Sequence, residues 1–221
     1  MEDSPWKVNM IAKLVRAEGI APKHICDVGC GAGAVLAGMH HEFPEAKLFG
    51  FDVAPDAAKF WPQYSNAEID FRIGDFLDLS SRSYDLVLVL DVVEHVADPF
   101  EFLVRLRGHG NWFMFHFPLD LSALNVLREK PLIDARDRVG HIHYFTKGLA
   151  LALLRECGYE VRVWRYTGAA FSGPRKTWKT RLAQLPRWLA YCLGKDLGVR
   201  LVGGETLLVL ARPRIDADTP A

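Results

Sequence analysis

The sequence predicts an α/β fold in which helices cover both faces of a parallel, doubly wound sheet. Short apolar runs alternate with stretches of helical periodicity along most of the chain, and this alternation is typical of parallel sheets. The most apolar run, YDLVLVL at 84–90, is almost continuous, as expected for a central strand that is buried on both faces. The 221 residues, half of them hydrophobic, are enough for one well-packed domain and too few for two.

The predicted elements follow one another in a regular order. A first helix is expected over 5–18, because Ser4 can cap it and Gly19 can end it. The sequence then predicts strands over 24–28, 47–51, 69–73, 84–90, 111–117, 161–166 and 206–210. Further helices are predicted over 34–43, 54–64, 99–106 and 149–157.

Two stretches stand outside this alternation. Residues 119–140 and 172–204 are expected to be helical insertions that form a lid over a substrate. We therefore predict a single domain over 1–214, with a disordered tail over 215–221. The core of this domain is expected at about 20–165 and 205–212.

The charge balance and the spacing of the cysteines argue against several classes of function. Lys and Arg together number 27, as do Asp and Glu, so no charge excess indicates nucleic acid as a partner. The four cysteines form no C-x-x-C pair, so we expect reduced thiols in a cytoplasmic protein rather than a zinc ribbon or a redox motif. The first residues lack the layout of a signal peptide, and no apolar run is long enough to span a bilayer.

The segment HICDVGCGAGAVL at 24–36 carries the strongest functional signal. A predicted strand leads into Gly29, Gly31 and Gly33, which form a tight turn before a helix. The free N–H groups of the helix N-terminus and the close approach that glycine allows predict a polar or anionic ligand. Because Ala34 completes a G-x-G-x-x-A pattern, the turn alone fits a nicotinamide or flavin cofactor as well as S-adenosylmethionine.

Three acidic residues bear on the choice between these cofactors. Asp27, directly before the glycines, suits the sulfonium and ammonium of that cofactor and would repel a pyrophosphate. Asp52 ends the next strand, where a carboxylate can accept hydrogen bonds from the ribose hydroxyls of either cofactor. Asp75, after Gly74, can accept the adenine amino group, and Phe76 can pack on the ring, although an ordinary turn or helix cap explains this aspartate equally well.

The fourth strand ends in DVVEHVADP at 91–99. This places Asp91, Glu94 and His95 at the carboxyl end of the strand. Open α/β sheets bind their ligands at this end, so these side chains are candidates for the same site as the glycine turn.

The motifs together resemble those of class I S-adenosylmethionine-dependent methyltransferases. The matching segments are DVGCGAG at 27–33, Asp52, GDF at 74–76, DVVEHVADP at 91–99 and GHIHYFTKGLALALLRECGYEV at 140–161. The likeness spans about residues 20–165. It is closest to the branch that methylates small molecules, quinones, sugars and lipids.

The resemblance implies a Rossmann-like, seven-stranded sheet whose last strand runs antiparallel to the others. It also implies methyl transfer from S-adenosylmethionine, with S-adenosylhomocysteine as the product, to a small-molecule, sugar or lipid-linked acceptor at oxygen. The implied cofactor-binding residues are Asp27, Gly29, Cys30, Gly31, Gly33, Asp52, Val53, Gly74, Asp75, Phe76, Asp91, Val92 and Glu94.

Histidines are the candidates for chemistry on the acceptor, because an oxygen acceptor must lose a proton. His95, His141 and His143 are predicted catalytic residues, since histidine titrates near neutral pH. His116 lies inside a predicted strand, where a core histidine with satisfied hydrogen bonds is expected instead. The spacings of the histidines and nearby acids match no metal-ligand pattern, so no metal is predicted.

Residues 172–200 combine seven basic residues with interleaved tryptophan, leucine and tyrosine. Contact with a membrane surface or recognition of a phosphate on the acceptor would fit this composition. A helical lid with a solvated basic face fits it better.

Two other functions stay open. An NAD(P)-dependent oxidoreductase would explain the glycines and Asp52, but it gives no reason for Asp27, GDF or DVVEH. A non-catalytic adenosyl-binding or interaction protein could keep the same motifs. Nucleic acid is not expected as the acceptor, because the chain has no N-P-P-Y-type motif for base amines. A monomer or a homodimer is expected.

Overall fold

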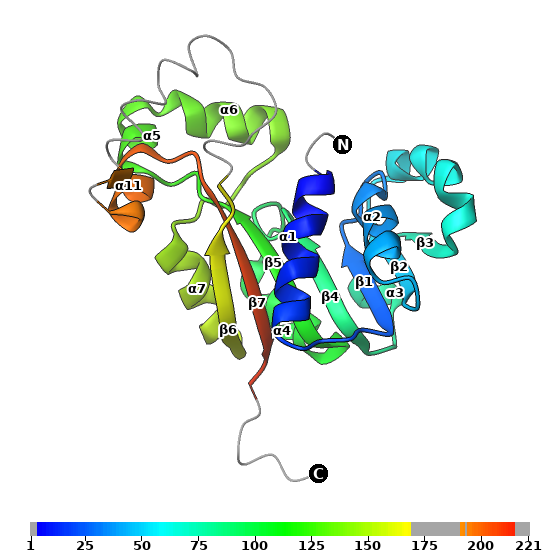
Figure 1. Cartoon of the computed structure of the whole chain (residues 1–221). Helices are drawn as coiled ribbons and strands as arrows, with labels where there is room; N and C mark the ends of the chain where they lie inside the picture. Colours follow the sequence, from blue (N-terminus) through cyan, green and yellow to red (C-terminus); the bar gives the residue numbers. More distant parts are fainter. Residues whose placement is uncertain (1–3, 169–190, 193, 215–221) are drawn as a thin grey trace.

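Seven strands form one mixed sheet with the spatial order β3-β2-β1-β4-β5-β7-β6 (Figure 1). The computed structural model describes residues 4–168, 191–192 and 194–214. The strands are β1 His24–Val28, β2 Lys47–Asp52, β3 Ile69–Ile73, β4 Tyr84–Leu90, β5 Gly110–Pro118, β6 Tyr159–Tyr166 and β7 Thr206–Pro213. All seven predicted strands are confirmed.

The helices account for most of the remaining described residues. They are α1 Ser4–Ala17, α2 Ala34–Glu42, η1 Pro55–Ala67, α3 Phe76–Leu79, α4 Pro99–Leu106, η2 Arg107–His109, α5 Ala123–Arg128, α6 Lys130–Val139, α7 Lys147–Glu156 and α11 Lys195–Val202. One predicted helix differs in kind, because the stretch expected over 54–64 is the 3-10 segment η1. Pro62 interrupts its backbone hydrogen bonds, and Tyr64 has non-helical angles.

The last strand lies inside the sheet and runs against both of its neighbours. β7 pairs antiparallel with β5 on one side and with β6 on the other. Val209 of β7 is opposite Phe115 of β5 and Trp164 of β6. The predicted antiparallel last strand is therefore confirmed, and it extends to Pro213.

Strand β4 is buried on both faces, as its continuous apolar sequence predicted. Leu86 and Leu88 belong to the hydrophobic cluster that includes α1 and α2. Val87 and Val89 belong to the cluster on the other face, which includes α4 and α7. All four side chains are fully buried, so the doubly wound arrangement is confirmed (Figure 1).

Helices α5, α6 and α11 gather beyond the end of the sheet where β5 ends and β7 begins (Figure 1). The predicted helical insertion at 119–140 consists of α5 and α6, and α11 packs against α5. Of the second predicted insertion, 172–204, the structure describes 191–192 and 194–204, including α11. The rest of that insertion and the tail over 215–221 lie outside the described residues, and the division into one domain stays a prediction.

None of the helices in the described part of the chain is long and apolar enough to cross a membrane.

Candidate functional site

Strand β1 leads into a turn whose three glycines have left-handed backbone angles. The φ angle is 76° at Gly29, 52° at Gly31 and 81° at Gly33, and glycine adopts such angles without strain. The N–H of Gly29 donates to the carbonyl of Phe51 over 2.8 Å, which fastens the turn to the end of β2. A Cβ at Gly29 would stand 2.6 Å from Cγ2 of Val92. Both this lack of room for a side chain and the backbone angle therefore require glycine here.

Asp52 ends β2 and faces this turn. One carboxylate oxygen accepts the N–H of Gly31 over 2.6 Å, and the other accepts the N–H of Ala54 over 2.8 Å. The indole N–H of Trp61 donates to the carbonyl of Gly31 over 2.9 Å, and its ring stacks on Phe71 with 4.8 Å between centroids. The carboxylate is thus held at the turn, where the sequence predicted a ribose-binding acid.

A cavity of about 460 Å³ opens at the carboxyl ends of the central strands. Eight of the predicted cofactor-binding residues line it, namely Gly29, Asp52, Val53, Gly74, Asp75, Phe76, Asp91 and Val92. The predicted catalytic residue His95 also lines it, beside Val96 and Phe102, which the sequence analysis missed. A volume of this size suits a small-molecule ligand.

The other five predicted cofactor-binding residues are not among the residues that line this cavity. They are Asp27, Cys30, Gly31, Gly33 and Glu94. Asp27, Cys30 and Glu94 are buried.

Asp27 is buried at the end of β1, with 3% of its surface exposed. Burial raises the pKa of its carboxyl to about 8, Lys7 opposes this rise, and Asp52 adds to it. Its Oδ1 has no hydrogen-bond partner among the described residues. The glycine turn therefore has a buried acid behind it whose hydrogen-bonding capacity is not used up by the protein.

Asp75 begins helix α3. Its side chain accepts the N–H of Leu77 over 2.8 Å, so the structure shows the helix cap that the sequence offered as an alternative. Phe76 is buried, and its ring meets that of Phe51 edge-on with 5.1 Å between centroids. Both residues still border the cavity.

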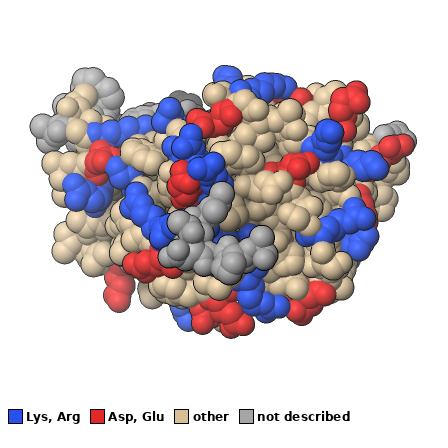
Figure 2. Space-filling view, turned by 90° about the horizontal axis from the view of Figure 1, so that it is seen from below, with Lys and Arg blue, Asp and Glu red and all other residues tan. Residues whose placement is uncertain are grey.

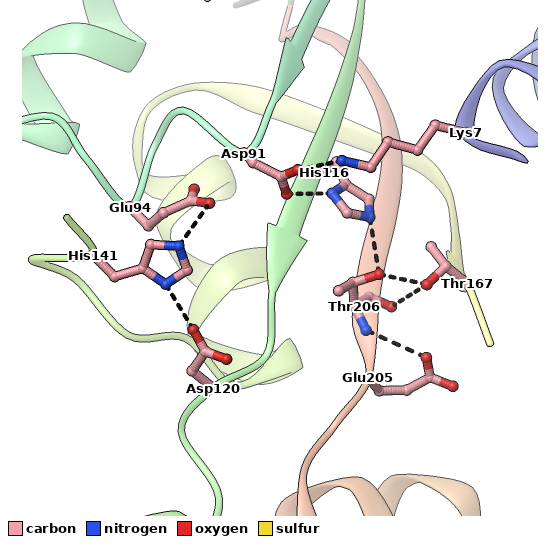
Figure 3. Close-up of polar contacts among 9 residues, drawn as sticks. All are labelled: Lys7, Asp91, Glu94, His116, Asp120, His141, Thr167, Glu205 and Thr206. Atoms are coloured by element: carbon pink, nitrogen blue, oxygen red, sulfur yellow. Dashed lines mark hydrogen bonds and ion pairs between the residues drawn. The ribbon is translucent and has the colours of Figure 1, made fainter. Parts of the chain in front are cut away.

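Asp91 follows β4 with a φ of 55°, which is unusual for a residue with a side chain. Its carboxylate is paired with Lys7 of α1 and accepts Nδ1–H of His116 over 2.5 Å (Figure 3). Burial alone would raise the pKa of Asp91, but the hydrogen bonds and charges of His116 and Lys7 outweigh burial and hold it well below its usual range.

His116 connects this carboxylate to β7. Its Nε2 shares a hydrogen bond of 2.9 Å with the hydroxyl of Thr206, which in turn bonds to the hydroxyl of Thr167. Only 3% of His116 is exposed. The prediction of a core histidine with satisfied hydrogen bonds is confirmed.

Glu94 is fully buried beside Asp91 and faces His141 (Figure 3). Burial raises the pKa of its carboxyl to about 8; its own backbone N–H and Lys7 oppose this rise, and the charges of Asp91 and Asp120 add to it. Nε2 of His141 lies 4.0 Å from Oε1 of Glu94, while its Nδ1–H donates to Asp120 over 2.8 Å.

The three predicted catalytic histidines separate into a pair and a single residue. The rings of His95 and His141 are 5.0 Å apart between centroids, and Nδ1–H of His95 donates to the carbonyl of Gly140 over 3.0 Å. His143 instead donates from Nε2 to the carbonyl of Val96 over 3.0 Å. His95 and His141 therefore act as one cluster, and His143 holds the loop beside it.

The sequence analysis missed Lys7, Asp120 and Thr206. Lys7 lies in a predicted helix and Thr206 in a predicted strand, where nothing in the local pattern marks either as part of a site. Asp120 falls in an insertion without a usable motif. Only their position in space connects them to Asp91 and His141, so a single sequence holds no signal that would have found them.

Comparison with known proteins bears on the class of this domain. Residues 26–110 match the family model described as "Methyltransferase domain". The ubiquinone biosynthesis O-methyltransferase of Nitrosomonas europaea is 30% identical over 123 residues, which cover 52% of this chain and 51% of that protein. The protein of the same name from Cereibacter sphaeroides is 35% identical over 88 residues, covering 38% of this chain and 35% of the relative. The chain thus spans about half, or less, of the length of these curated relatives.

Solved structures share the fold over almost the whole chain. Magnesium protoporphyrin IX methyltransferase from Synechocystis PCC 6803, solved with bound S-adenosylhomocysteine, has a TM-score of 0.63 at 16% identity and covers 96% of this chain and 83% of that one. A plantazolicin methyltransferase, solved with a monoazolic desmethylPZN analogue and S-adenosylhomocysteine, has a TM-score of 0.62 at 16% identity and covers 97% of this chain and 86% of that one.

The sheet order and the glycine turn define an α/β domain with the class I methyltransferase fold. Residues 26–110, which include β2 to β4, the glycine turn and Asp52, are the part of this fold that is similar to the methyltransferase family model.

Proposed function

We propose that this protein transfers a methyl group from S-adenosylmethionine to an oxygen of a small-molecule, sugar or lipid-linked acceptor. The observation that carries the proposal is the cavity at the strand ends, because eight of the residues that the sequence assigned to this cofactor line it together. The names of the curated relatives, which are O-methyltransferases, support oxygen as the acceptor atom.

Two features of the structure fit S-adenosylmethionine. The unused buried oxygen of Asp27 can attract a cation or accept a proton near the glycine turn. Asp52, held at the same turn by Gly31, is in place to accept hydrogen bonds from ribose hydroxyls.

The reaction needs alignment and removal of a proton. When bound, S-adenosylmethionine supplies a sulfonium methyl group, whose carbon bonds to the acceptor oxygen as its bond to sulfur breaks and leaves the electron pair on sulfur. Holding the two partners in line supplies much of the rate enhancement. We assign activation of the acceptor hydroxyl to the cluster of His95 and His141, since His95 reaches the cavity. His143, held by the carbonyl of Val96, is the weaker candidate.

The first experiment is calorimetric titration of the protein with S-adenosylmethionine, S-adenosylhomocysteine and NADH. We expect micromolar binding of the first two and none of NADH. Asp52→Ala should weaken that binding by about 10- to 100-fold, the value of one or two hydrogen bonds to a charged group. Asp56→Ala is the matched control, because the side chain of Asp56 is exposed and pairs with the exposed Lys59.

Binding of NADH alone would make the glycine turn a dinucleotide site and overturn the proposal. Binding of S-adenosylmethionine without turnover on a panel of hydroxylated sugars, quinones and lipid-linked compounds would favour a non-catalytic adenosyl-binding protein. Normal affinity of Asp52→Ala would show that the cavity is not the cofactor site.

The partners and the location of the protein stay predictions. All four cysteines are free, which supports the predicted cytoplasmic location. On the face shown in Figure 2, basic and acidic side chains are interspersed, which supports a partner other than nucleic acid. Most of the predicted membrane-surface segment 172–200 lies outside the described residues, and the choice between monomer and homodimer is untested.

A further inference from the structure

We propose that Glu94, His95 and His141 form a binding site for a divalent transition-metal ion such as Zn²⁺. Each of the three offers one ligand atom, and these atoms all lie within 4.8 Å of one another. Some catalytic zinc sites use one carboxylate and two imidazoles as ligands. The same set binds iron(II) in non-haem oxygenases. The spacing along the chain did not predict a metal, because His141 comes from a distant segment.

The carboxylate of Glu94 is the first reason for this assignment. Its side chain is fully buried, and neither of its oxygens accepts a hydrogen bond from another of the described residues. Burial of a polar group without hydrogen bonds is unfavourable. Asp91 and Asp120 add negative charge nearby, and Lys7, whose charge acts on Glu94, is already paired with Asp91. A divalent cation would offset this local excess of negative charge.

The hydrogen bonds of the two histidines are the second reason. Nδ1–H of His95 donates to the carbonyl of Gly140, and Nδ1–H of His141 donates to the carboxylate of Asp120. Each neutral ring then has an unprotonated Nε2, which is the form that binds metals. Outer partners of this kind, a backbone carbonyl and a carboxylate, are those that orient metal-binding histidines in known sites. Figure 3 shows the free ring nitrogen of His141 directed at Glu94.

The backbone holds these side chains together without a metal. The N–H groups of Ile142 and His143 both donate to the carbonyl of Glu94, over 2.9 Å and 3.1 Å. These two bonds fix the segment that carries His141 against the segment that carries His95. A site with its ligands positioned in advance needs only small side-chain rotations to close on an ion.

The ion would face the cavity, because His95 is one of the lining residues. Three protein ligands leave a coordination position for a further ligand. If the proposed function is right, that position suits the acceptor hydroxyl. His95 and His141 would then activate this hydroxyl as ligands of the ion and not as bases, because the ion would make it more acidic and its proton would pass to water. Metal binding itself does not depend on the proposed function.

The test is calorimetric titration of the full chain, freed of metal by a chelator, with Zn²⁺ and separately with Co²⁺. We expect one ion per chain, and the visible absorption of bound Co²⁺ reports its nitrogen and oxygen ligands. Glu94→Gln, which keeps the side-chain shape, and His141→Ala should each weaken binding by at least about 10-fold. His41→Ala is the control for unspecific binding to histidine, because His41 is exposed on α2.

Thermal unfolding of each variant shows whether it is folded. Failure of the unmodified chain to take up either ion at millimolar concentration would overturn the proposal, as would unchanged affinity in both folded variants. A further variant, Asp120→Asn, should weaken binding by about 10- to 100-fold through His141. If Zn²⁺ binds as expected but no acceptor is methylated, the proposed function fails and the metal site stands.

Discussion

Two buried carboxylates, near the ends of β1 and β4, have unusual pKa values. Asp27 and Glu94 are both buried, and burial raises the pKa of each to about 8. Perturbed pKa values of this kind gather at functional sites. Asp91 lies near Glu94, yet its pKa is held low, because His116 and Lys7 supply hydrogen bonds and charge. Neighbouring acids of one site thus differ in charge at neutral pH for reasons visible in their contacts.

Asp27 makes the stability of the ligand-free protein depend on pH. Its folded pKa of about 8 lies above its ordinary value of 3.8, so folding favours the protonated carboxyl. This contribution is complete below the unfolded pKa and is lost as the pH rises through the folded pKa. We expect urea unfolding to show stability falling by a few kcal/mol between about pH 4 and 8. Asp27→Asn, which cannot ionise, should reduce this fall and leave the part that comes from Glu94, whose pKa is also raised to about 8.

The control for that experiment is Asp56→Asn, because the Asp56 side chain is largely exposed. It should reproduce the pH dependence of the unmodified chain. A fall in stability as steep in Asp27→Asn as in the unmodified chain would assign the dependence to other groups.

Site residues that belong to sequence motifs could be predicted. Residues that form hydrogen bonds to them from distant parts of the chain could not. Asp52, Asp75 and the glycines could be found because they follow strands at fixed positions. Asp120 could not, because a hydrogen bond to a histidine twenty-one residues away depends on how the insertion folds back. The pairing of His141 with Glu94 was hidden for the same reason.

The glycine turn is the element on which the site depends most. Its left-handed φ angles and the approach of Val92 to Gly29 leave no room for a side chain. Gly29→Ala should therefore destabilise the protein by about 2–4 kcal/mol, from backbone strain and overpacking together. Guanidinium unfolding measures the change.

Gly108→Ala is the matched control for the turn. No atom lies within 4 Å of a Cβ at this position, and its backbone angle is not left-handed. The substitution should change the free energy of unfolding by less than about 0.5 kcal/mol. Equal effects of the two substitutions would mean that the turn tolerates a side chain.

The elements themselves were predictable where one periodicity dominates. β4 was recognised from a run of apolar residues, and the structure buries that run on both faces. The helix expected over 54–64 was less well described, because Pro62 and the packing of Trp61 on Phe71 favour a tighter, kinked segment. Helix α3 was missed, since four residues are too few to show a period.

At the scale of the whole molecule, His116 connects the parallel strands β4 and β5 to the antiparallel strand β7. It lies on β5, bonds to Asp91 after β4, and reaches Thr206 at the start of β7. His116→Ala removes both bonds and leaves a cavity in a fully packed region. We expect a loss of about 2–4 kcal/mol in the free energy of unfolding.

Urea unfolding of His116→Ala beside His41→Ala tests this expectation. His41 is exposed, so His41→Ala should change the free energy of unfolding by less than about 0.5 kcal/mol. A similarly small effect at His116 would show that the hydrogen bonds from β4 to β7 do not stabilise the sheet.

The strand order has a consequence for how the chain is made. β7 is the last strand in the sequence, yet it lies between β5 and β6. While the ribosome is still producing residues 206–213, strands β3, β2, β1, β4 and β5 can already pair, but β6 has no neighbour to join. Both β5 and β6 then present open edges, which are sites of aggregation in nascent chains. The sheet becomes continuous only after its final strand has left the exit tunnel.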